Sequence, residues 1–117
     1  PEPLPHETIE HILGLAQRTP SWCNTQPWQV SVVSGAALLR LGATLYEKAR
    51  SGAAPNPDFA FPEAYLDVYR ERRKVCGVQL YQALDIGKDD RESAAQQALE
   101  NFRLFGAPHV AIVTTEK

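Results

Sequence analysis

The stretch TPSWCNTQPWQVSVVSG, residues 19–35, joins a polar and aromatic loop to an alternating apolar segment. Its first part holds two Trp, two Pro, Ser, Cys, Asn and Gln, and its second part begins at Trp28. Trp28, Val30 and Val32 alternate with Gln29 and Ser31, which predicts a strand over residues 28–34. The next valine interrupts the polar side of this alternation, so we expect the strand to be covered on both faces.

The loop concentrates side chains that both donate and accept hydrogen bonds, namely Ser21, Asn24, Thr25 and Gln26. Such groups match the edge of a heterocycle that carries carbonyls and ring nitrogens. The two tryptophans offer flat faces for stacking, and the two prolines stiffen the loop, which lowers the ordering cost of binding. Residue types alone leave a second interpretation equally open, in which the amides cap neighbouring backbone and Trp28 fills the core.

Helical periodicity is predicted on both sides of this stretch. In residues 5–18 the apolar positions 9, 12, 13 and 16 form one face of an amphipathic helix that begins at a proline and stops at Thr19 and Pro20. Residues 36–50 are rich in Ala and Leu and predict a second helix that closes near Gly52. The proline-rich residues 52–62 follow as a long loop, a kind that is usually functional or mobile.

The second half of the sequence predicts two more helices and a strand. Residues 63–84 read as a long, central helix with apolar surface over much of its circumference. Gly87 is its expected stop, and Asp89 or Asp90 is the expected N-cap of a helix that runs to Phe105, with its apolar residues inward.

Residues 109–115, HVAIVTT, are a β-branched run typical of a buried strand. Two strands make a marginal sheet, so more chain or a partner is expected.

Composition places limits on the compartment and the partners. The chain has 117 residues, 12 basic against 14 acidic, and a net charge of −2, which argues against general attraction to nucleic acid. Cys23 and Cys76 stand far apart and are predicted to be free thiols. A signal-peptide pattern and a membrane-spanning apolar run are both missing from these residues, so we expect a cytoplasmic location and no membrane partner.

One basic cluster stands out: residues 70–74 hold Arg70, Arg72, Arg73 and Lys74. The plain interpretation is a solvated helix face, and the alternative is an anion site.

Motifs for nucleotide cradles and nucleophilic catalysis are missing. The sequence has no P-loop, no GxGxxG fingerprint and no GxSxG elbow, and Ser21 has no evident base beside it. His6, His11 and His109 are expected to be surface or capping residues rather than catalytic ones. We therefore predict no catalytic side chain and no metal site in these residues.

The order of motifs resembles the FMN-dependent nitroreductase family. Residues 19–35 resemble its PS-x-x-N-x-QPW loop and following strand, and residues 5–18 fit its preceding helix. YRERRKVCGVQLYQALDIGKDD, residues 69–90, looks like its central helix and exit, and NFRLFGAPHVAIVTT, residues 101–115, resembles its turn into a core strand. The resemblance implies an α+β fold, a nitroreductase-like α/β/α sandwich with a central mixed, mainly antiparallel sheet, of which residues 1–117 are the N-terminal portion of one FMN-binding domain.

The resemblance also implies a homodimer with FMN at the subunit interface, reduced by NADH or NADPH and reoxidised by a small-molecule acceptor in ping-pong fashion. The acceptor would be a nitroaromatic, a quinone or a related compound, and the cofactor carries the chemistry. The matching loop residues would form part of the flavin pocket: Pro20, Ser21, Trp22, Asn24 and Gln26. In this comparison Ser21 and Asn24 hydrogen-bond the flavin, Gln26 supports the loop or the ring edge, and Arg70 or Arg73 meets the pyrimidine carbonyls.

The sequence departs from the family pattern in two ways. Many relatives carry a small or hydroxylic residue where this chain has Trp22, so we expect a narrower pocket or a different range of acceptors. Relatives also have an Arg-rich start and a second half that supply phosphate contacts and further strands. Neither lies within residues 1–117, so this segment alone is expected to bind FMN poorly, because a phosphate dianion needs charge-assisted partners.

Other functions stay open at this point. The same fold could support dehalogenation, enoyl-type reduction or flavin fragmentation. From a different class, the chain could be a helical interaction module that docks a protein through its Trp-rich loop, since Trp and Arg are frequent binding anchors.

Overall fold

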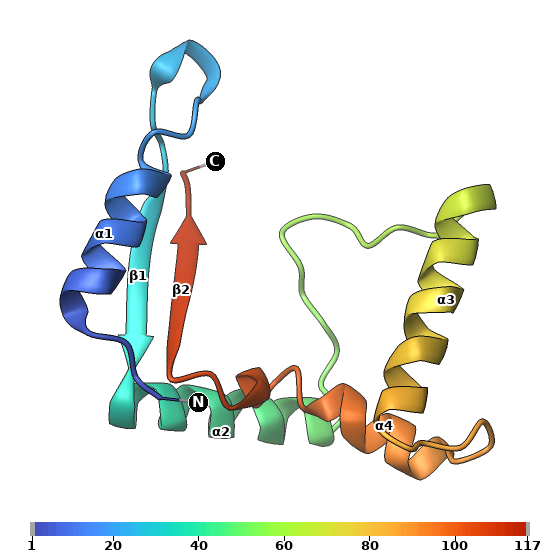
Figure 1. The fold of residues 1–117 in the computed structure, drawn as a ribbon. Helices are drawn as coiled ribbons and strands as arrows, with labels where there is room; N and C mark the ends of the chain where they lie inside the picture. Colours follow the sequence, from blue (N-terminus) through green and yellow to red (C-terminus); the bar gives the residue numbers. More distant parts are fainter. Residues whose placement is uncertain (1, 117) are drawn as a thin grey trace.

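The computed structural model describes residues 2–116 and shows an open arrangement of helices around one antiparallel pair of strands (Figure 1). The helices and strands follow the predicted order, apart from two short 3₁₀ turns. The elements are α1 (His6–Ala16), η1 (Trp22–Asn24), β1 (Gln29–Ser34), α2 (Gly35–Arg50), α3 (Asp67–Ala83), α4 (Arg91–Leu99), η2 (Leu104–Gly106) and β2 (His109–Thr114). Among these residues no helix is long and apolar enough to cross a membrane.

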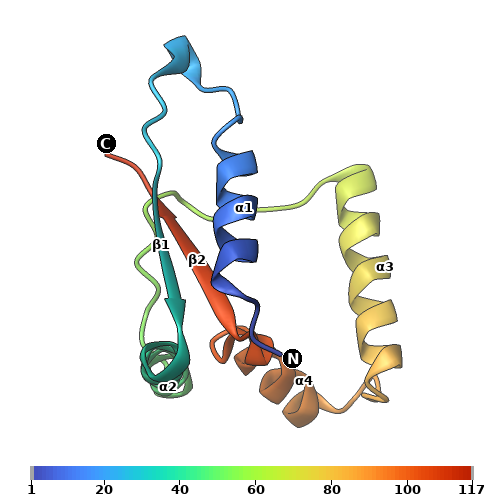
Figure 2. The ribbon, with the colours of Figure 1, turned by 60° about the vertical axis from the view of Figure 1, so that its left-hand side comes forward.

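The two strands pair antiparallel although 74 residues separate them in the chain, from position 35 to position 108. The register runs from Gln29 opposite Thr114 to Ser34 opposite His109. Figure 2 shows α1 alongside this pair, with α2 crossing its lower end. The strand predictions for residues 28–34 and 109–115 are confirmed to within one residue at each end.

The ends of α2 and α4 are built as the sequence predicts. After α2, Gly52 adopts a left-handed φ of 74°, its N–H donates to Ala49 O, and Ala53 N–H donates to Lys48 O. This is the Schellman arrangement, for which glycine is the usual residue. Asp90 caps α4, since its Oδ1 accepts from Ser93 N–H at 3.0 Å. Hydrogen bonds from the side chain and backbone of Ser93 lower the pKa of Asp90.

The long helix differs from its predicted bounds at both ends. It begins at Asp67 rather than residue 63, because Leu66 is extended and Asp67 has a φ of 47°, which no continuous helix accommodates. At the other end Asp85, and not Gly87, adopts the left-handed conformation that ends the helix, with Ile86 N–H donating to Tyr81 O. Aspartate is among the residues that tolerate this conformation.

The prediction of a helix running to Phe105 was wrong. The α-helix ends at Leu99, after which the backbone continues in three-residue turns, with Phe102 N–H bonded to Leu99 O. Leu104 and Phe105 then take left-handed φ values of 58° and 50°. This turn leaves the Phe105 side chain 63% exposed rather than inward.

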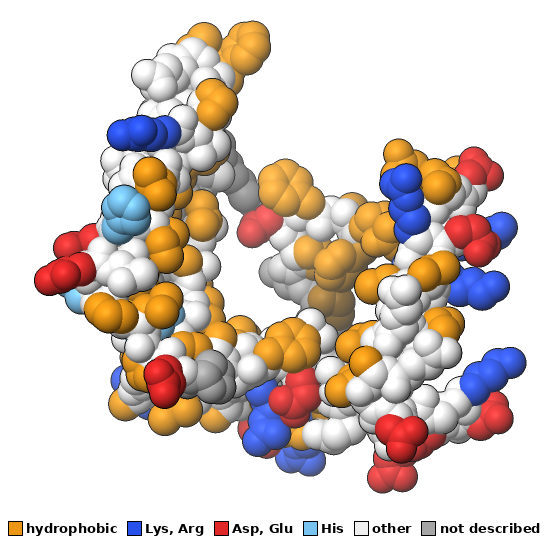
Figure 3. Space-filling view, in the orientation of Figure 1, with side chains coloured by type: hydrophobic (Ala, Val, Ile, Leu, Met, Phe, Trp, Pro, Cys, Tyr) orange, Lys and Arg blue, Asp and Glu red, His pale blue; other side chains and the backbone are white. Residues whose placement is uncertain are grey.

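Very little of the apolar surface is buried within residues 2–116. Leu38 of α2 is the one buried large hydrophobic residue among them, at 6% exposure. The accessible surface is 10393 Å², against about 6,300 Å² for a folded monomer of this mass. The radius of gyration is 17.7 Å, where a compact chain of this length has about 13 Å. Figure 3 shows hydrophobic side chains around an open hollow between the strands and α3. Apolar surface of both the sheet and the long helix is therefore exposed within these residues.

Candidate functional site

The polar and aromatic loop links α1 to β1 and lies at the end of the strands remote from α2 (Figure 1). Its short 3₁₀ turn covers Trp22–Asn24. Cys23, Asn24 and Gln26 all have positive φ, between 46° and 54°. Three non-glycine residues in this conformation within four positions need local compensation, because each costs free energy relative to extended or helical backbone.

The Gln26 amide provides that compensation. Its Nε2 donates to Thr19 O at 3.0 Å and to Asn24 Oδ1 at 2.9 Å, with a longer contact to Ser21 Oγ at 3.4 Å. Its Oε1 accepts from Trp28 Nε1 at 3.0 Å. The side chain therefore ties the start, the tip and the end of the loop together. Of the two roles expected for Gln26, support of the loop is the one that this geometry matches.

Ser21 and Asn24 keep donor capacity after these bonds are made. Ser21 Oγ accepts from Gln26 N–H at 2.8 Å, and Asn24 Oδ1 accepts from Gln26 Nε2. Neither the Ser21 hydroxyl hydrogen nor Asn24 Nδ2 donates to an atom within residues 2–116. Both residues can therefore present O–H and N–H groups to a ligand, and carbonyl oxygens and ring nitrogens are the acceptors that fit.

The two tryptophans have different environments. Trp22 is 89% exposed, whereas Trp28 is 39% exposed and held through its indole N–H by Gln26. Trp28 is thus fixed to the loop rather than buried in a core of the described chain. Trp22 presents a large flat surface that no contact within the loop uses, as a stacking partner or a pocket wall would.

Within one chain, Arg70 and Arg73 do not lie beside the loop. Both lie on α3, which stands across the hollow from the loop in the two ribbon views (Figures 1 and 2). Arg73 instead places its guanidinium carbon 5.5 Å from the centre of the Tyr65 ring. A pocket that includes both the loop and these arginines therefore requires a second copy of the chain or a different position of α3.

The cysteines match their prediction, since Cys23 and Cys76 are both free and exposed. Of the histidines, His109 has a structural contact that sequence reasoning did not find: its Nε2 accepts from Leu4 N–H at 2.9 Å. This bond ties the segment before α1 to the start of β2. A surface or capping role for this histidine was expected from the sequence. Its partner, however, lies 105 residues away, and no sequence pattern indicates that contact.

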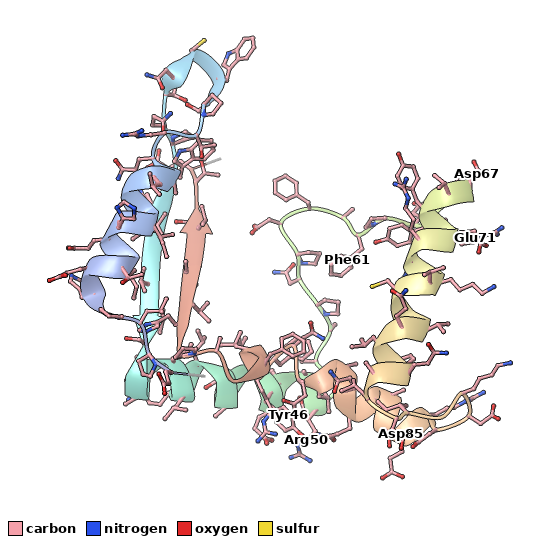
Figure 4. The ribbon with its side chains drawn as sticks, viewed as in Figure 1. Tyr46, Arg50, Phe61, Asp67, Glu71 and Asp85 are labelled. Carbon is pink, nitrogen blue, oxygen red and sulfur yellow. The ribbon has the colours of Figure 1, made fainter. Side chains whose placement is uncertain are left out.

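A separate groove follows α2 and the turn before β2, at the end of the molecule remote from the loop. It is lined mainly by apolar and small residues, among them Leu38, Leu39, Gly42, Tyr46 and Pro108. Figure 4 shows Tyr46 on α2, where its ring lies 5.1 Å from the guanidinium carbon of Arg103. None of the predicted site residues lines this groove.

Comparison with known proteins decides the family. The sequence of residues 1–117 matches the family model of the nitroreductase family. The chain belongs to the nitroreductase family. A nitroreductase NfnB from Mycolicibacterium smegmatis is 40% identical over 97% of this chain and 48% of its own length, and a 4-nitrobenzoate reductase from Pseudomonas putida is 35% identical over 99% of this chain and 51% of its own length.

The fold agrees with this assignment. The crystal structure of the FMN-dependent nitroreductase NfnB from Mycobacterium smegmatis, in complex with NADPH, superimposes with a TM-score of 0.89 at 38% identity, and the match covers 97% of this chain and 51% of that one. The α+β nitroreductase fold predicted from the sequence is therefore confirmed. The chain spans about half the length of the nitroreductases it matches.

Proposed function

We propose that the protein containing this chain is an FMN-dependent oxidoreductase that passes reducing equivalents from NADPH or NADH to nitroaromatic, quinone or related acceptors. The observation that carries the proposal is the amide-braced loop, in which Gln26 fixes the backbone while Ser21 and Asn24 keep free donors. Membership of the nitroreductase family and likeness to an FMN-dependent member support it. Such a donor set fits the carbonyls and ring nitrogens of a flavin.

In this proposal the residues of the chain bind and orient. FMN, when bound, supplies the hydride and electron chemistry, so no protein nucleophile is required. Ser21 and Asn24 donate to the ring edge, Gln26 holds their positions, and Pro20 limits the freedom of the loop. Trp22 forms a wall that excludes water. From α3, Arg70 or Arg73 donates to the ring carbonyls.

The separation of the loop from α3 supports a pocket shared by two copies of the protein. The two parts of the proposed site stand on opposite sides of the hollow (Figure 1), and the hydrophobic side chains around it need a cover (Figure 3). In a homodimer the loop of one protomer can meet α3 of its partner. A single cofactor face, used in turn by NADPH and by the acceptor, corresponds to the ping-pong order expected from the sequence.

Purification of the complete protein tests this function directly. We expect a yellow protein whose oxidised-flavin absorbance is bleached by NADPH under anaerobic conditions and restored by nitrobenzene or 4-nitrobenzoate. A protein that stays colourless after incubation with FMN would exclude the proposal. Sedimentation analysis of the same sample measures whether it is a dimer.

Asn24→Ala is expected to weaken FMN binding by the complete protein about tenfold, because it removes a free amide donor and an acceptor of Gln26. Flavin fluorescence titration of the apoprotein measures the dissociation constant. Asn56→Ala, in the exposed loop after α2, is the matched control and is expected to leave it unchanged. Equal affinity for the Asn24 variant and the original protein would remove Asn24 from the pocket.

Trp22→Ser is expected to change the acceptor range several-fold while leaving the fold intact, since this side chain is 89% exposed and makes no contact that the loop needs. Compared with the original protein, the variant should gain kcat/KM for bulky nitroaromatics relative to nitrobenzene. Steady-state kinetics with a series of acceptors of increasing width measures this ratio. A ratio that does not move across the series would show that Trp22 is not a wall of the pocket.

A further inference from the structure

A single hydrogen bond joins the start of the chain to the strands. Leu4 N–H donates to His109 Nε2 at 2.9 Å, although 105 positions separate the two residues in the sequence. Within residues 2–116, no other hydrogen bond or ion pair links residues 2–18 to β1 or β2. No residue of α1 is fully buried, so apolar packing contributes little to holding this helix beside the strands.

The segment that donates this hydrogen bond is stiff. Residues 3–5 read Pro-Leu-Pro, and we call residues 2–5 the leading segment. Proline has no N–H, fixes its own φ at about −65° and disfavours helical backbone at the residue before it. Leu4 N–H is therefore the one backbone donor of residues 3–5, and Pro5 is extended, with φ −58° and ψ 146°. One hydrogen bond is enough to place a segment with so little conformational freedom.

The bond requires one protonation state of the imidazole. A ring nitrogen that accepts a hydrogen bond carries no proton, so His109 is neutral and holds its proton on Nδ1. Nδ1 is buried and has no hydrogen-bond partner among residues 2–116. A second proton would occupy Nε2, in place of the lone pair that Leu4 N–H uses. Two donors would then face each other, so protonation of the ring breaks the bond.

The described chain offers no carboxylate that pairs with a charged His109. Its ion pairs are His6–Glu10, Glu47–Arg50 and Glu100–Arg103. β1, the strand opposite His109, has no titratable side chain. Other titratable or charged groups lie on the elements around the ring: Glu2 in the leading segment, His6 and Glu7 in the first turn of α1, Arg40, Tyr46 and Glu47 on α2, and Arg103 before β2. None of these groups forms a hydrogen bond with the imidazole among residues 2–116.

We infer that His109 is a proton-sensitive latch, which holds the leading segment and α1 against the strands when its ring is neutral and releases them when the ring is protonated. Histidine is the side chain whose charge ordinarily changes between about pH 5 and pH 8, so the latch opens on mild acidification. α1 leads directly into the loop that carries Ser21 and Asn24 (Figure 1), so its release also frees the start of that loop. The inference goes beyond the proposed function and does not rest on it.

Hydrogen exchange of the Leu4 amide measures the latch in the complete protein, labelled with ¹⁵N-leucine. We expect the protection factor of this amide, which corrects for the intrinsic effect of pH on exchange, to fall about tenfold from about pH 8 to about pH 5. His109→Gln places an amide oxygen near the position of Nε2 and does not titrate, so protection should persist at both pH values. His109→Asn is too short to reach Leu4 N–H and should lose protection at both. Nitrogen chemical shifts of the His109 ring report its tautomer and its protonation.

Two references separate the latch from other effects of pH. The amide of Leu41, in the middle of α2, should keep its protection throughout. His6→Gln removes the titrating member of the His6–Glu10 pair and should leave the pH dependence at Leu4 unchanged. The inference is overturned by protection at Leu4 that does not vary with pH, by a pH dependence that persists in His109→Gln, by protection that survives in His109→Asn, or by a loss that Leu41 shares.

Discussion

Expressed without the rest of its protein, the 117-residue segment is expected to show no cooperative unfolding transition and to retain no FMN. Its accessible surface of 10393 Å² exceeds the area of a compact monomer of its mass by about 4,000 Å². Among the described residues 2–116, Leu38 is the one large hydrophobic residue that is buried, so the transfer of apolar groups from water contributes little to stability. The entropy cost of ordering the chain is then not offset.

The measurement is a urea titration of the isolated segment followed by near-ultraviolet circular dichroism, with the complete protein as the control. We expect a gradual, featureless change and strong binding of an apolar dye by the segment, and a sigmoidal transition in the control. A sharp transition in a monomeric segment would show that residues 1–117 form a core that the exposed areas do not reveal. The hollow would then belong to the folded segment itself, and it would not be a surface against which further chain packs.

Local chemistry predicts those elements whose ends are set by nearby residues. The strand after Trp28, the close of α2 at Gly52 and the cap of α4 at Asp90 all depend on side chains within a few positions. The start of α3 depends instead on a left-handed residue that is not glycine, Asp67, and left-handed Leu104 and Phe105 end the turns that follow α4. Sequence patterns do not identify such positions, because nothing in the residue type demands that conformation.

In the candidate site, too, some features could be predicted from residue types and others could not. The residue types of the loop left a planar polar ligand and a purely structural role equally open, and they did not predict the hydrogen bonds of Gln26, since its amide could equally have faced a ligand. The ring contacts of Arg72 and Arg73 were also missed, although Tyr69 and Arg72 stand three residues apart, a spacing that places side chains together on a helix. The long helix predicted to be central has no buried residue within the described part of the chain, and the apolar pattern of its sequence did not predict that exposure.

Gln26→Leu is expected to release FMN from the complete protein, with affinity reduced at least tenfold and more than in Asn24→Ala. The substitution keeps much of the side-chain volume but removes the donors to Thr19 O and Asn24 Oδ1 and the acceptor of Trp28 Nε1. Each such bond contributes about 1 kcal/mol, and about 1.4 kcal/mol corresponds to a tenfold change in affinity. Three left-handed residues would lose the contacts that compensate their backbone conformation.

Gln26→Glu distinguishes the donor function of this amide from its acceptor function. The carboxylate keeps an acceptor for Trp28 Nε1 but faces Thr19 O and Asn24 Oδ1 without a donor, so its FMN affinity should fall between those of the original protein and Gln26→Leu. Gln17→Leu, at the end of α1, makes the same chemical change outside the loop and should leave FMN affinity unchanged. Thermal unfolding of each apoprotein distinguishes loss of the loop from loss of the fold. Unaltered FMN affinity in Gln26→Leu would mean that the ligand-binding conformation of the loop does not depend on this amide, and the site would have to be placed elsewhere.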